Sequence, residues 1–443
     1  MKIEIYRRPF ARAMMLLVFL GLLAAPLRQS AHGQTLDSNR RIGVEMAELI
    51  KKDIQKNYYD PTFRGINLDA HFAAVEAKVK TANSIGEILG IMARSLMEFN
   101  DSHTFFLIPP PADDIEQGWS LEMIGDKCFV TAVKPGSDAE AKGLKPGDEV
   151  LSLAGSTPTR DGLWKLWYFL RFQPSISLLV RSAGAETRSL TVMAKIVRGK
   201  PVYNLGSSTG VDNVDLIRQW ENYARLTRHR YIDNKDLLIW KMPQFDDEHI
   251  VDEMMDKARN HKALILDLRG NGGGYEDTLL RLLGYMFDHD VKIYDIKSRT
   301  ETKPMIAKTR GSKRIFNGEL IVLVDSESGS SAELFARIVQ LEKRGKVIGD
   351  LTSGSVMRAI HASHKSGMDL YFIYGASVTV SDLFMTDGKS LEGHGVTPDE
   401  LLLPSSADLA AQRDPVLSRA ADLAGFTVTP EKAGTFFPVE WKP

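Results

Sequence analysis

The sequence predicts a multi-domain α/β protein with an N-terminal helical bundle, a small β domain and a C-terminal α/β domain around a buried sheet. The N-terminal part repeats apolar residues at three- and four-residue spacing, as amphipathic helices do. The middle part alternates short strands with turns that contain Gly and Pro, and the last part alternates β-branched apolar runs with amphipathic stretches. The length of 443 residues is consistent with about two to four domains.

The composition is that of an ordinary globular protein, with 43% hydrophobic and 26% charged residues. The 56 basic and 57 acidic residues leave a formal net charge of −1, which gives no indication of nucleic-acid binding. The single cysteine, Cys128, excludes an intramolecular disulfide and a cysteine-based metal cluster.

Residues 1–33 have the pattern of a secretory signal peptide. Basic residues precede the uncharged run "MMLLVFLGLLAAPL" (Met14 to Leu27), and the small-residue stretch "SAHGQ" follows, with cleavage expected after Gly33. About 14 apolar residues fall short of the roughly 20 needed to span a bilayer. We therefore expect an exported protein, periplasmic or extracellular after removal of the signal peptide, and we leave residues 1–33 out of the fold prediction.

Residues 34–115 form the predicted helical region. Three runs have the helical spacing: "VEMAELIKKDIQKNYY", "LDAHFAAVEAKVKTA" and "SIGEILGIMARSLMEF". The last run is followed by "NDSHT" and by the Pro-rich stretch "FFLIPPP", where a helix cannot continue.

Residues 116–200 form the predicted β domain. The stretch "SDAEAKGLKPGDEVLSLAG" indicates a short helix, a tight turn and a strand, and it resembles a PDZ domain. PDZ domains bind extended peptides at a sheet edge and hold the terminal carboxylate with backbone amides. By this resemblance the peptide-binding loop and strand comprise Gly118, Trp119, Ser120 and Leu121.

Residues 201–410 form the predicted C-terminal α/β domain, and residues 411–443 a C-terminal extension. The strands of the α/β domain are expected in apolar runs that indicate a largely buried sheet, namely "DLLIWKM", "KALILDLRG", "ELIVLVDSE", "GKVIGDL" and "LYFIYGASVTV".

Ser330 in "ESGSSAELFARI" lies where a strand passes into a helix. A helix start offers free N–H groups and the positive end of the helix dipole, which suits a nucleophile whose reaction forms an oxyanion. On this local pattern alone, Ser330 or Ser331 is more simply a helix cap, with Glu333 completing a capping box.

A second loop strengthens the catalytic interpretation. "LILDLRGNGGG" runs from a strand into a glycine-rich turn that can present amides to an anion, although it is neither a Walker motif nor a dinucleotide fingerprint. Two such strand ends in one sheet suggest a shared oxyanion site.

These motifs together resemble peptidase family S41, the C-terminal processing and tricorn-type serine proteases. "LILDLRGNGGG", "GSSAE", "VIGDLTSGS" and "LEGHGVTPDE" occur in the order found in that family, behind a helical region and a PDZ-like module. The resemblance implies an α/β protease domain at residues 201–410, with Ser330 as nucleophile. It also implies the amides of Ser331 and Gly273 as oxyanion donors, the latter to within one residue of the glycine run.

The base does not follow the C-terminal processing pattern, because Ser355 occupies the place of that branch's lysine. Lys343 and Lys346 belong to other elements. In the tricorn-type branch a histidine preceded by serine takes this role, with a later Ser or Glu orienting it. That resemblance implies His103 as the base, with Ser102 and Glu392 as its partners. Glu392 would orient the imidazole through Ser102 or through a water.

Three other histidines are alternatives to His103. His394 is two residues from Glu392, and His361 with His364 has the spacing of a metal-binding pair, but no third ligand accompanies it at a suitable spacing. We expect a structural role for that pair, no metal and no cofactor.

The sequence thus predicts an exported serine endopeptidase that cleaves peptides or unfolded protein tails through an acyl-enzyme. Its expected partner is a peptide or protein substrate, with capture of the substrate's C-terminus as one means of binding; no nucleic acid is expected, and contact with a membrane is not required. The alternative is a catalytically silent protein that keeps the protease-like fold and binds peptides or another ligand, which the missing lysine at position 355 favours.

Overall fold

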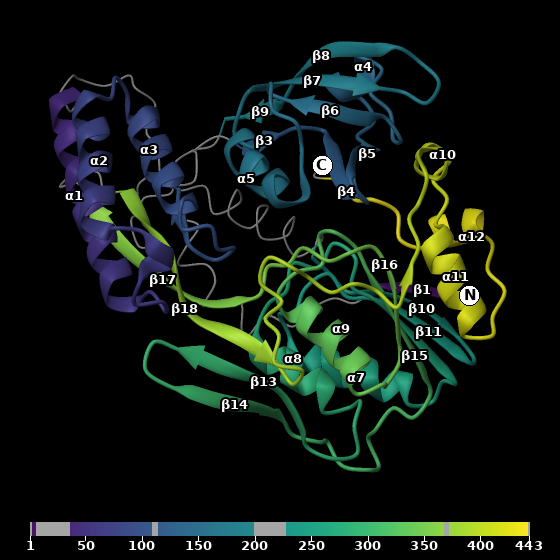
Figure 1. The fold of residues 1–443 in the computed structure, drawn as a ribbon. Coiled ribbons are helices and arrows are strands. Elements are labelled where there is room, and N and C mark those ends of the chain that lie inside the picture. Colours follow the sequence, from purple (N-terminus) through teal and green to yellow (C-terminus); the bar gives the residue numbers. More distant parts are fainter. Residues whose placement is uncertain (1, 6–35, 109–113, 199–226, 367–371, 442–443) are drawn as a thin grey trace, which may run out of the picture.

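The computed structural model describes residues 2–5, 36–108, 114–198, 227–366 and 372–441. Figure 1 shows the N-terminal helices on one side, the small β domain above, and the α/β domain below with the C-terminal helices at its other side. The predicted fold class is confirmed in its coarse form, a mixed α/β chain with several sheets and an N-terminal helical region.

The helical region contains α1 (Leu36–Asn57), the 3₁₀ turn η3 (Phe63–Gly65), α2 (Leu68–Thr81) and α3 (Ile85–Met97). Asn67 caps α2 and Ser84 caps α3, because each side-chain oxygen accepts from a backbone N–H of the first turn. The apolar faces of these helices form one core, which includes Met46, Phe72 and Met92.

The β domain is a five-stranded antiparallel sheet in the order β4-β5-β6-β7-β8. Its elements are β4 (Trp119–Ile124), β5 (Lys127–Val133), α4 (Asp138–Ala141), β6 (Glu149–Leu153), α5 (Arg160–Leu170), β7 (Ser175–Arg181) and β8 (Thr187–Met193). A separate two-stranded ribbon, β3 (Asp114–Glu116) with β9 (Lys195–Val197), joins the entry and exit of this domain.

The α/β domain is built on a seven-stranded sheet in the order β1-β10-β11-β12-β15-β16-β19. Its strands are β1 (Lys2–Ile5), β10 (Arg230–Asn234), β11 (Leu237–Lys241), β12 (Ala263–Asp267), β15 (Glu319–Val324), β16 (Lys346–Gly349) and β19 (Glu400–Leu401). The pairs from β11 to β19 are parallel, so their carboxyl ends lie at the same edge of the sheet.

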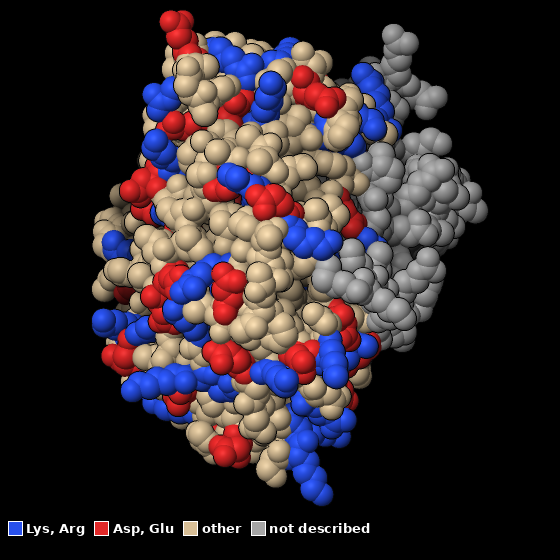
Figure 2. Space-filling model, turned by 90° about the vertical axis from the view of Figure 1, so that its right-hand side faces the viewer, with Lys and Arg blue, Asp and Glu red and all other residues tan. Residues whose placement is uncertain are grey.

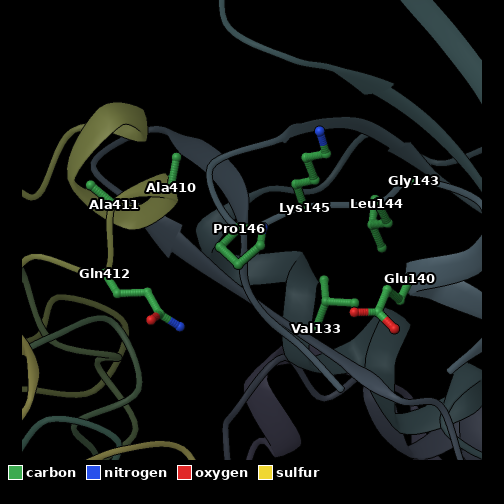
Figure 3. A pocket seen from close by; sticks show the side chains of 9 residues that line it. All are labelled: Val133, Glu140, Gly143, Leu144, Lys145, Pro146, Ala410, Ala411 and Gln412. Atoms are coloured by element: carbon green, nitrogen blue, oxygen red, sulfur yellow. The ribbon is translucent and has the colours of Figure 1, made fainter. Parts of the chain in front are cut away.

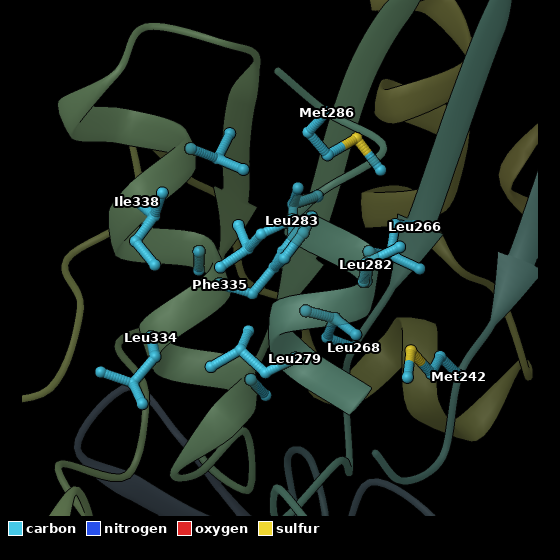
Figure 4. Close-up of a cluster of buried hydrophobic side chains, with 14 of the residues drawn as sticks. Met242, Leu266, Leu268, Leu279, Leu282, Leu283, Met286, Leu334, Phe335 and Ile338 are labelled. Carbon is cyan, nitrogen blue, oxygen red and sulfur yellow. The ribbon is translucent and has the colours of Figure 1, made fainter. Parts of the chain in front are cut away.

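Helices cover both faces of this sheet, which is why its strands are apolar without alternation. One face packs against α7 (Glu248–Ala258), α8 (Glu276–Leu283) and α9 (Ser331–Leu341), and Figure 4 shows Leu266 of β12 with Leu282 and Phe335 in that core. The other face, with Ile239 and Ile265, packs against α11 (Pro415–Leu423) and α12 (Pro430–Gly434). In the range 411–443, expected as an extension, the described residues up to 441 therefore complete the core of this domain. The short α10 (Ser406–Ala410) precedes them.

A second sheet connects the α/β domain to the helical region. It contains β13 (Val291–Ser298), β14 (Thr302–Ala307), β17 (Met357–Ser366) and β18 (Phe372–Met385), and β2 (Phe105–Leu107) pairs with β18. We expected the stretch around Tyr374 to join the main sheet, and this was wrong. Instead Tyr374, Ala376 and Val378 of β18 complete the core of the helical region.

The first residues of the chain also differ from expectation. Lys2–Ile5 form strand β1, which pairs antiparallel with β10 and is the edge strand of the main sheet; the rest of the predicted signal peptide lies outside the described residues. Within the described ranges, no helix has the length and apolarity needed to cross a bilayer. Acidic and basic side chains alternate over the face in Figure 2, in line with the net charge of −1.

Candidate active site

Ser330 stands between β15 and α9, at the edge where the parallel strands end. Its backbone has φ 52° and ψ −117°, a region that residues other than glycine rarely adopt. Such a conformation costs about 1–3 kcal/mol and persists only where surrounding contacts impose it. Ser331 is the first residue of α9, so its amide has no acceptor within the helix and is available to an oxyanion.

Glu333 supplies the contacts that hold this turn. Its buried carboxylate accepts from the Ser330 amide at 3.0 Å, the Gly354 amide at 2.8 Å and the Ser355 amide at 2.9 Å. The Thr352 hydroxyl donates to it at 2.6 Å and the Ser353 hydroxyl at 3.3 Å. Burial raises the pKa of Glu333 to about 7, against the opposing effect of these donors. The predicted capping residue is thus also the anchor of the loop that carries Ser355.

The glycine loop lies directly against Ser330. A Cβ placed on Gly273 would lie 2.6 Å from Ser330 Cβ and 3.1 Å from Ser330 Oγ, and Gly273 has φ 102°. Only glycine both adopts this positive φ readily and lacks the Cβ for which there is no space. The Gly273 amide, however, donates to Asn271 Oδ1 at 2.8 Å in this conformation. Sequence reasoning missed Asn271, whose Nδ2 donates to the Met242 carbonyl and whose own carbonyl accepts from the Gly329 amide.

Ser102, His103 and Glu392 come together although 290 residues separate the serine from the glutamate. Ser102 Oγ donates to Glu392 Oε2 at 2.8 Å and lies 2.6 Å from His103 Nδ1. The Ser102 amide donates to Glu392 Oε1 at 2.7 Å. Because an ionised carboxylate only accepts, the Ser102 hydroxyl is directed to Glu392 and its oxygen accepts from His103 Nδ1–H. The other ring nitrogen, Nε2, is then left with its lone pair.

Burial lowers the pKa of His103 below 6.5, because the charged imidazolium is poorly solvated there. The Asp101 carboxylate opposes this effect and His361 adds to it. Burial raises the pKa of Glu392 above 4.5, while its bonds from Ser102 and Val356 act in the opposite direction. The imidazole is therefore neutral at pH 7, the state that a general base requires.

The Glu392–Ser102–His103 chain is connected to Ser330 through the loop that follows β16. The Ser330 amide donates to the Ser355 carbonyl at 3.0 Å, and the next amide, that of Val356, donates to Glu392 Oε2 at 2.9 Å. No hydrogen bond joins His103 to Ser330 among the described residues. Catalytic hydrogen bonds are often longer in an unliganded enzyme than in its substrate complex.

The other candidates have separate partners. His364 Nε2 lies 2.6 Å from Asp53 Oδ2, and His394 Nδ1 lies 2.9 Å from the carbonyl of Glu392. Lys346 pairs with Glu400 at 2.6 Å, away from the position that the lysine of the C-terminal processing branch would occupy. Within the described part of the chain, no group of three or more His, Cys, Asp or Glu residues has the arrangement of a metal site.

The predicted peptide-binding residues lie in and beside edge strand β4. Trp119 and Leu121 point into the core of the β domain, where the Trp119 ring meets that of Trp167 on α5. Gly118 has φ 75° and a Cβ there would meet Ser137 at 2.8 Å. At its far end β4 contacts the α/β domain, because Ser326 donates to the Met123 carbonyl at 2.6 Å.

A cavity of about 370 Å³ lies elsewhere, between the turn of the β domain around Pro146 and the residues that follow α10, as Figure 3 shows. Its lining includes Glu140, Lys145 and Gln412 but no residue of the Ser330 or His103 loops. It is separate from the candidate active site.

Comparisons with known proteins agree with this fold. Residues 236–402 match the family model of peptidase family S41. The chain is 25% identical over 341 residues to the tail-specific protease of Haemophilus influenzae, covering 72% of this chain and 46% of that protein. It is 24% identical over 378 residues to the chloroplastic carboxyl-terminal-processing peptidase 2 of Arabidopsis thaliana, covering 79% and 67%.

The solved structure of mature CPAF complexed with lactacystin has a similar fold, with a TM-score of 0.61 and 13% identity over 84% of this chain and 95% of that one. This likeness shows the fold alone. The chain is similar to peptidase family S41 over residues 236–402. It spans about half the length of the Haemophilus protein that it resembles.

Proposed function

We propose that this protein is a serine endopeptidase that uses Ser330 as nucleophile and His103 as general base. The observation that carries the proposal is the Glu392–Ser102–His103 chain, which leaves His103 Nε2 as a proton acceptor and is tied to the Ser330 backbone through Ser355 and Val356. The relatives named as proteases support the same reaction class.

In the proposed reaction, His103 Nε2 takes the proton of Ser330 Oγ as that oxygen attacks the scissile carbonyl. The Ser331 amide and an amide of the Gly272–Gly274 segment stabilise the oxyanion. His103 then gives its proton to the leaving amine, the peptide bond breaks, and an ester to Ser330 forms. A water, deprotonated by His103, attacks this ester; the ester bond breaks, His103 passes the proton to Ser330 Oγ, and the new carboxyl end is released. The Gly273 amide serves as the second donor once it leaves Asn271 Oδ1.

In this proposal the base is a histidine, as in the tricorn-type branch, and not a lysine. Ser355, which stands where a lysine would serve, presents its carbonyl to the Ser330 amide and its own amide to Glu333. These are backbone contacts, so the position works as a support for the turn that carries Ser330.

The substrate is proposed to be an extended peptide or an unfolded protein tail. The PDZ-like β domain presents edge strand β4 beside α5, the arrangement at which an added strand can pair. Because β4 meets Ser326 at its far end, a strand added there leads toward the loop that carries Ser330. The basic and apolar pattern of residues 1–33 supports export to the periplasm or the exterior.

The test is peptide cleavage by Ser330→Ala and His103→Ala, each expected to lose activity by at least about 10³-fold, since such groups act as a unit. His394→Ala is the matched control and should keep its activity, because that side chain is hydrogen-bonded to the backbone carbonyl of Glu392 and not to its carboxylate. A fluorophosphonate probe should label Ser330 alone. Undiminished cleavage by Ser330→Ala, or labelling of another residue, would refute the assignment.

A second candidate is a catalytically silent protein that binds peptides. The absence of a hydrogen bond between His103 and Ser330 in the described residues favours it, as does Ser355 in the place of lysine. It predicts tight peptide binding by the wild-type protein with neither cleavage nor probe labelling.

A further inference from the structure

We propose that Asp101 is a positioning residue that fixes the backbone of His103 and joins the active site to the N-terminal helical region. The inference rests on the proposed function, in which His103 is the base. Nothing in the sequence motifs singled out Asp101, which directly precedes the Ser102–His103 pair.

Asp101 is 4% exposed and its carboxylate accepts four hydrogen bonds. Oδ1 accepts from the amides of His103 at 3.0 Å and Thr104 at 2.7 Å, and from the Thr379 hydroxyl at 2.7 Å. Oδ2 accepts from the Tyr58 hydroxyl at 2.7 Å. These donors come from the His103 loop, from β18 and from the residue after α1, so one buried carboxylate connects three segments that are distant in sequence.

The two amides fix the orientation of the peptide planes on either side of His103. The preceding residue is fixed as well, because the Ser102 amide donates to Glu392. With the backbone held on both sides, the imidazole Nδ1 lies 2.6 Å from Ser102 Oγ. A catalytic group displaced by about 1 Å can cost up to about 10²-fold in rate. The arrangement therefore gives Asp101 a role in the chemical step without contact to substrate.

Asp101 also acts on His103 through its charge, since it raises the pKa of that imidazole against the effect of burial. Several ionisable groups surround the two residues and contribute to the local field: Glu392 from the loop after β18, His361 from β17, Tyr58 and Tyr59 after α1, and Arg64 from η3.

The test is Asp101→Asn in the full-length protein. The amide keeps the size and one acceptor oxygen but removes the charge. We expect kcat for peptide cleavage to fall about tenfold or more with KM little changed, because positioning of the base affects the chemical step. We also expect the imidazole of His103, followed by NMR titration, to lose its proton at a lower pH than in the wild type.

Two control variants separate charge from packing. Tyr58→Phe removes one donor to Asp101 but keeps the carboxylate, so the His103 titration should stay in place. Asp53→Asn removes a carboxylate that contacts another histidine, His364, and should change neither kcat nor the His103 titration.

Wild-type kcat and an unshifted His103 titration in Asp101→Asn would overturn the inference. If that variant does not fold, Thr379→Val provides the test: it frees Asp101 Oδ1 from one donor and should lower kcat at constant KM, and an unchanged kcat would overturn the inference. The titration of His103 needs no turnover, so it distinguishes failure of this inference from failure of the proposed peptidase function, which Ser330→Ala tests separately.

Discussion

Ser330 is held in a strained conformation by contacts that also assemble its surroundings. Its amide is shared between the Ser355 carbonyl and Glu333 Oε2, and its side chain lies against Gly273. The same contacts therefore stabilise the turn and keep the glycine loop within reach of the hydroxyl. Strain of this kind is characteristic of functional positions, and here the hydrogen bonds of the Ser330 amide offset it.

The pH dependence of activity should reflect His103. Burial lowers its pKa, so we expect kcat/KM to rise with pH along a limb centred below 6.5 and to reach its plateau by neutral pH. Between that lowered value and 6.5 the unfolded chain binds more protons at this residue than the folded chain, so stability contributed by His103 is lost as pH falls through this window. A pH–rate profile measures the limb, and a midpoint above 6.5 would contradict the assigned environment.

Gly273→Ala should abolish activity. The new methyl group would meet Ser330 Cβ at 2.6 Å on a backbone of φ 102°, so either Ser330 or the glycine loop must move. We expect a loss of about 10²- to 10³-fold in kcat, the scale of a lost oxyanion donor. Gly272→Ala, where a Cβ meets no atom within 4 Å, should remain far more active. Equal activity of the two variants in a peptide-cleavage assay would argue against a role for the close approach of Gly273 to Ser330.

At the scale of elements, the active site is a junction of four loops that two carboxylates tie together. Glu333 at the start of α9 binds the loop of residues 352–355, and Glu392 in the loop after β18 binds both Val356 and Ser102. Each tie is a carboxylate that accepts from backbone amides, which is a strong form of hydrogen bond.

Glu333→Gln should destabilise this junction. A glutamine offers one acceptor oxygen and an NH₂ group that faces N–H and O–H donors, so several buried donors lose their partner. Each orphaned donor costs roughly 1–3 kcal/mol, and we expect a clearly lower thermal unfolding midpoint together with loss of activity. Glu76→Gln, in a helix pair with Lys80, is the matched control and should unfold like the wild type.

The sequence predicted the helices, the buried strands and the motif loops, because periodicity and turn residues are local signals. It could not predict that the stretch around Tyr374 leaves the main sheet, since an apolar strand fits either core equally well. The meeting of Ser102 with Glu392 was expected only through the family resemblance. Asn271 and Asp101 were missed, because a buried polar residue is recognisable only by the donors that surround it.

At the scale of the whole molecule, β18 is shared between two cores. Its residues Tyr374, Ala376 and Val378 belong to the helical core, while Leu383 and Met385 belong to the core of the α/β domain. The helical region is therefore a structural part of the candidate active site, because it leads into the His103 loop and receives this strand.

Val378→Asp should disconnect the two regions. A charge in that core lacks a partner, so we expect release of the helices and loss of activity, although Ser330 is unaltered. Ile360→Asp is the matched control, because Ile360 is the cross-strand neighbour of Val378 and is 41% exposed. Limited proteolysis after α3 together with a cleavage assay compares the variants. Full activity of Val378→Asp would contradict the shared core.

The wide separation of Ser102 and Glu392 has a consequence for synthesis. The chain grows from its N-terminus, and the partner of Ser102 follows 290 residues later. A nascent chain that has already exposed the serine and glycine loops still lacks the acceptor that orients His103. In the proposed peptidase, cleavage therefore cannot begin before the chain has been made as far as Glu392, which protects unfinished copies and their neighbours from premature cleavage.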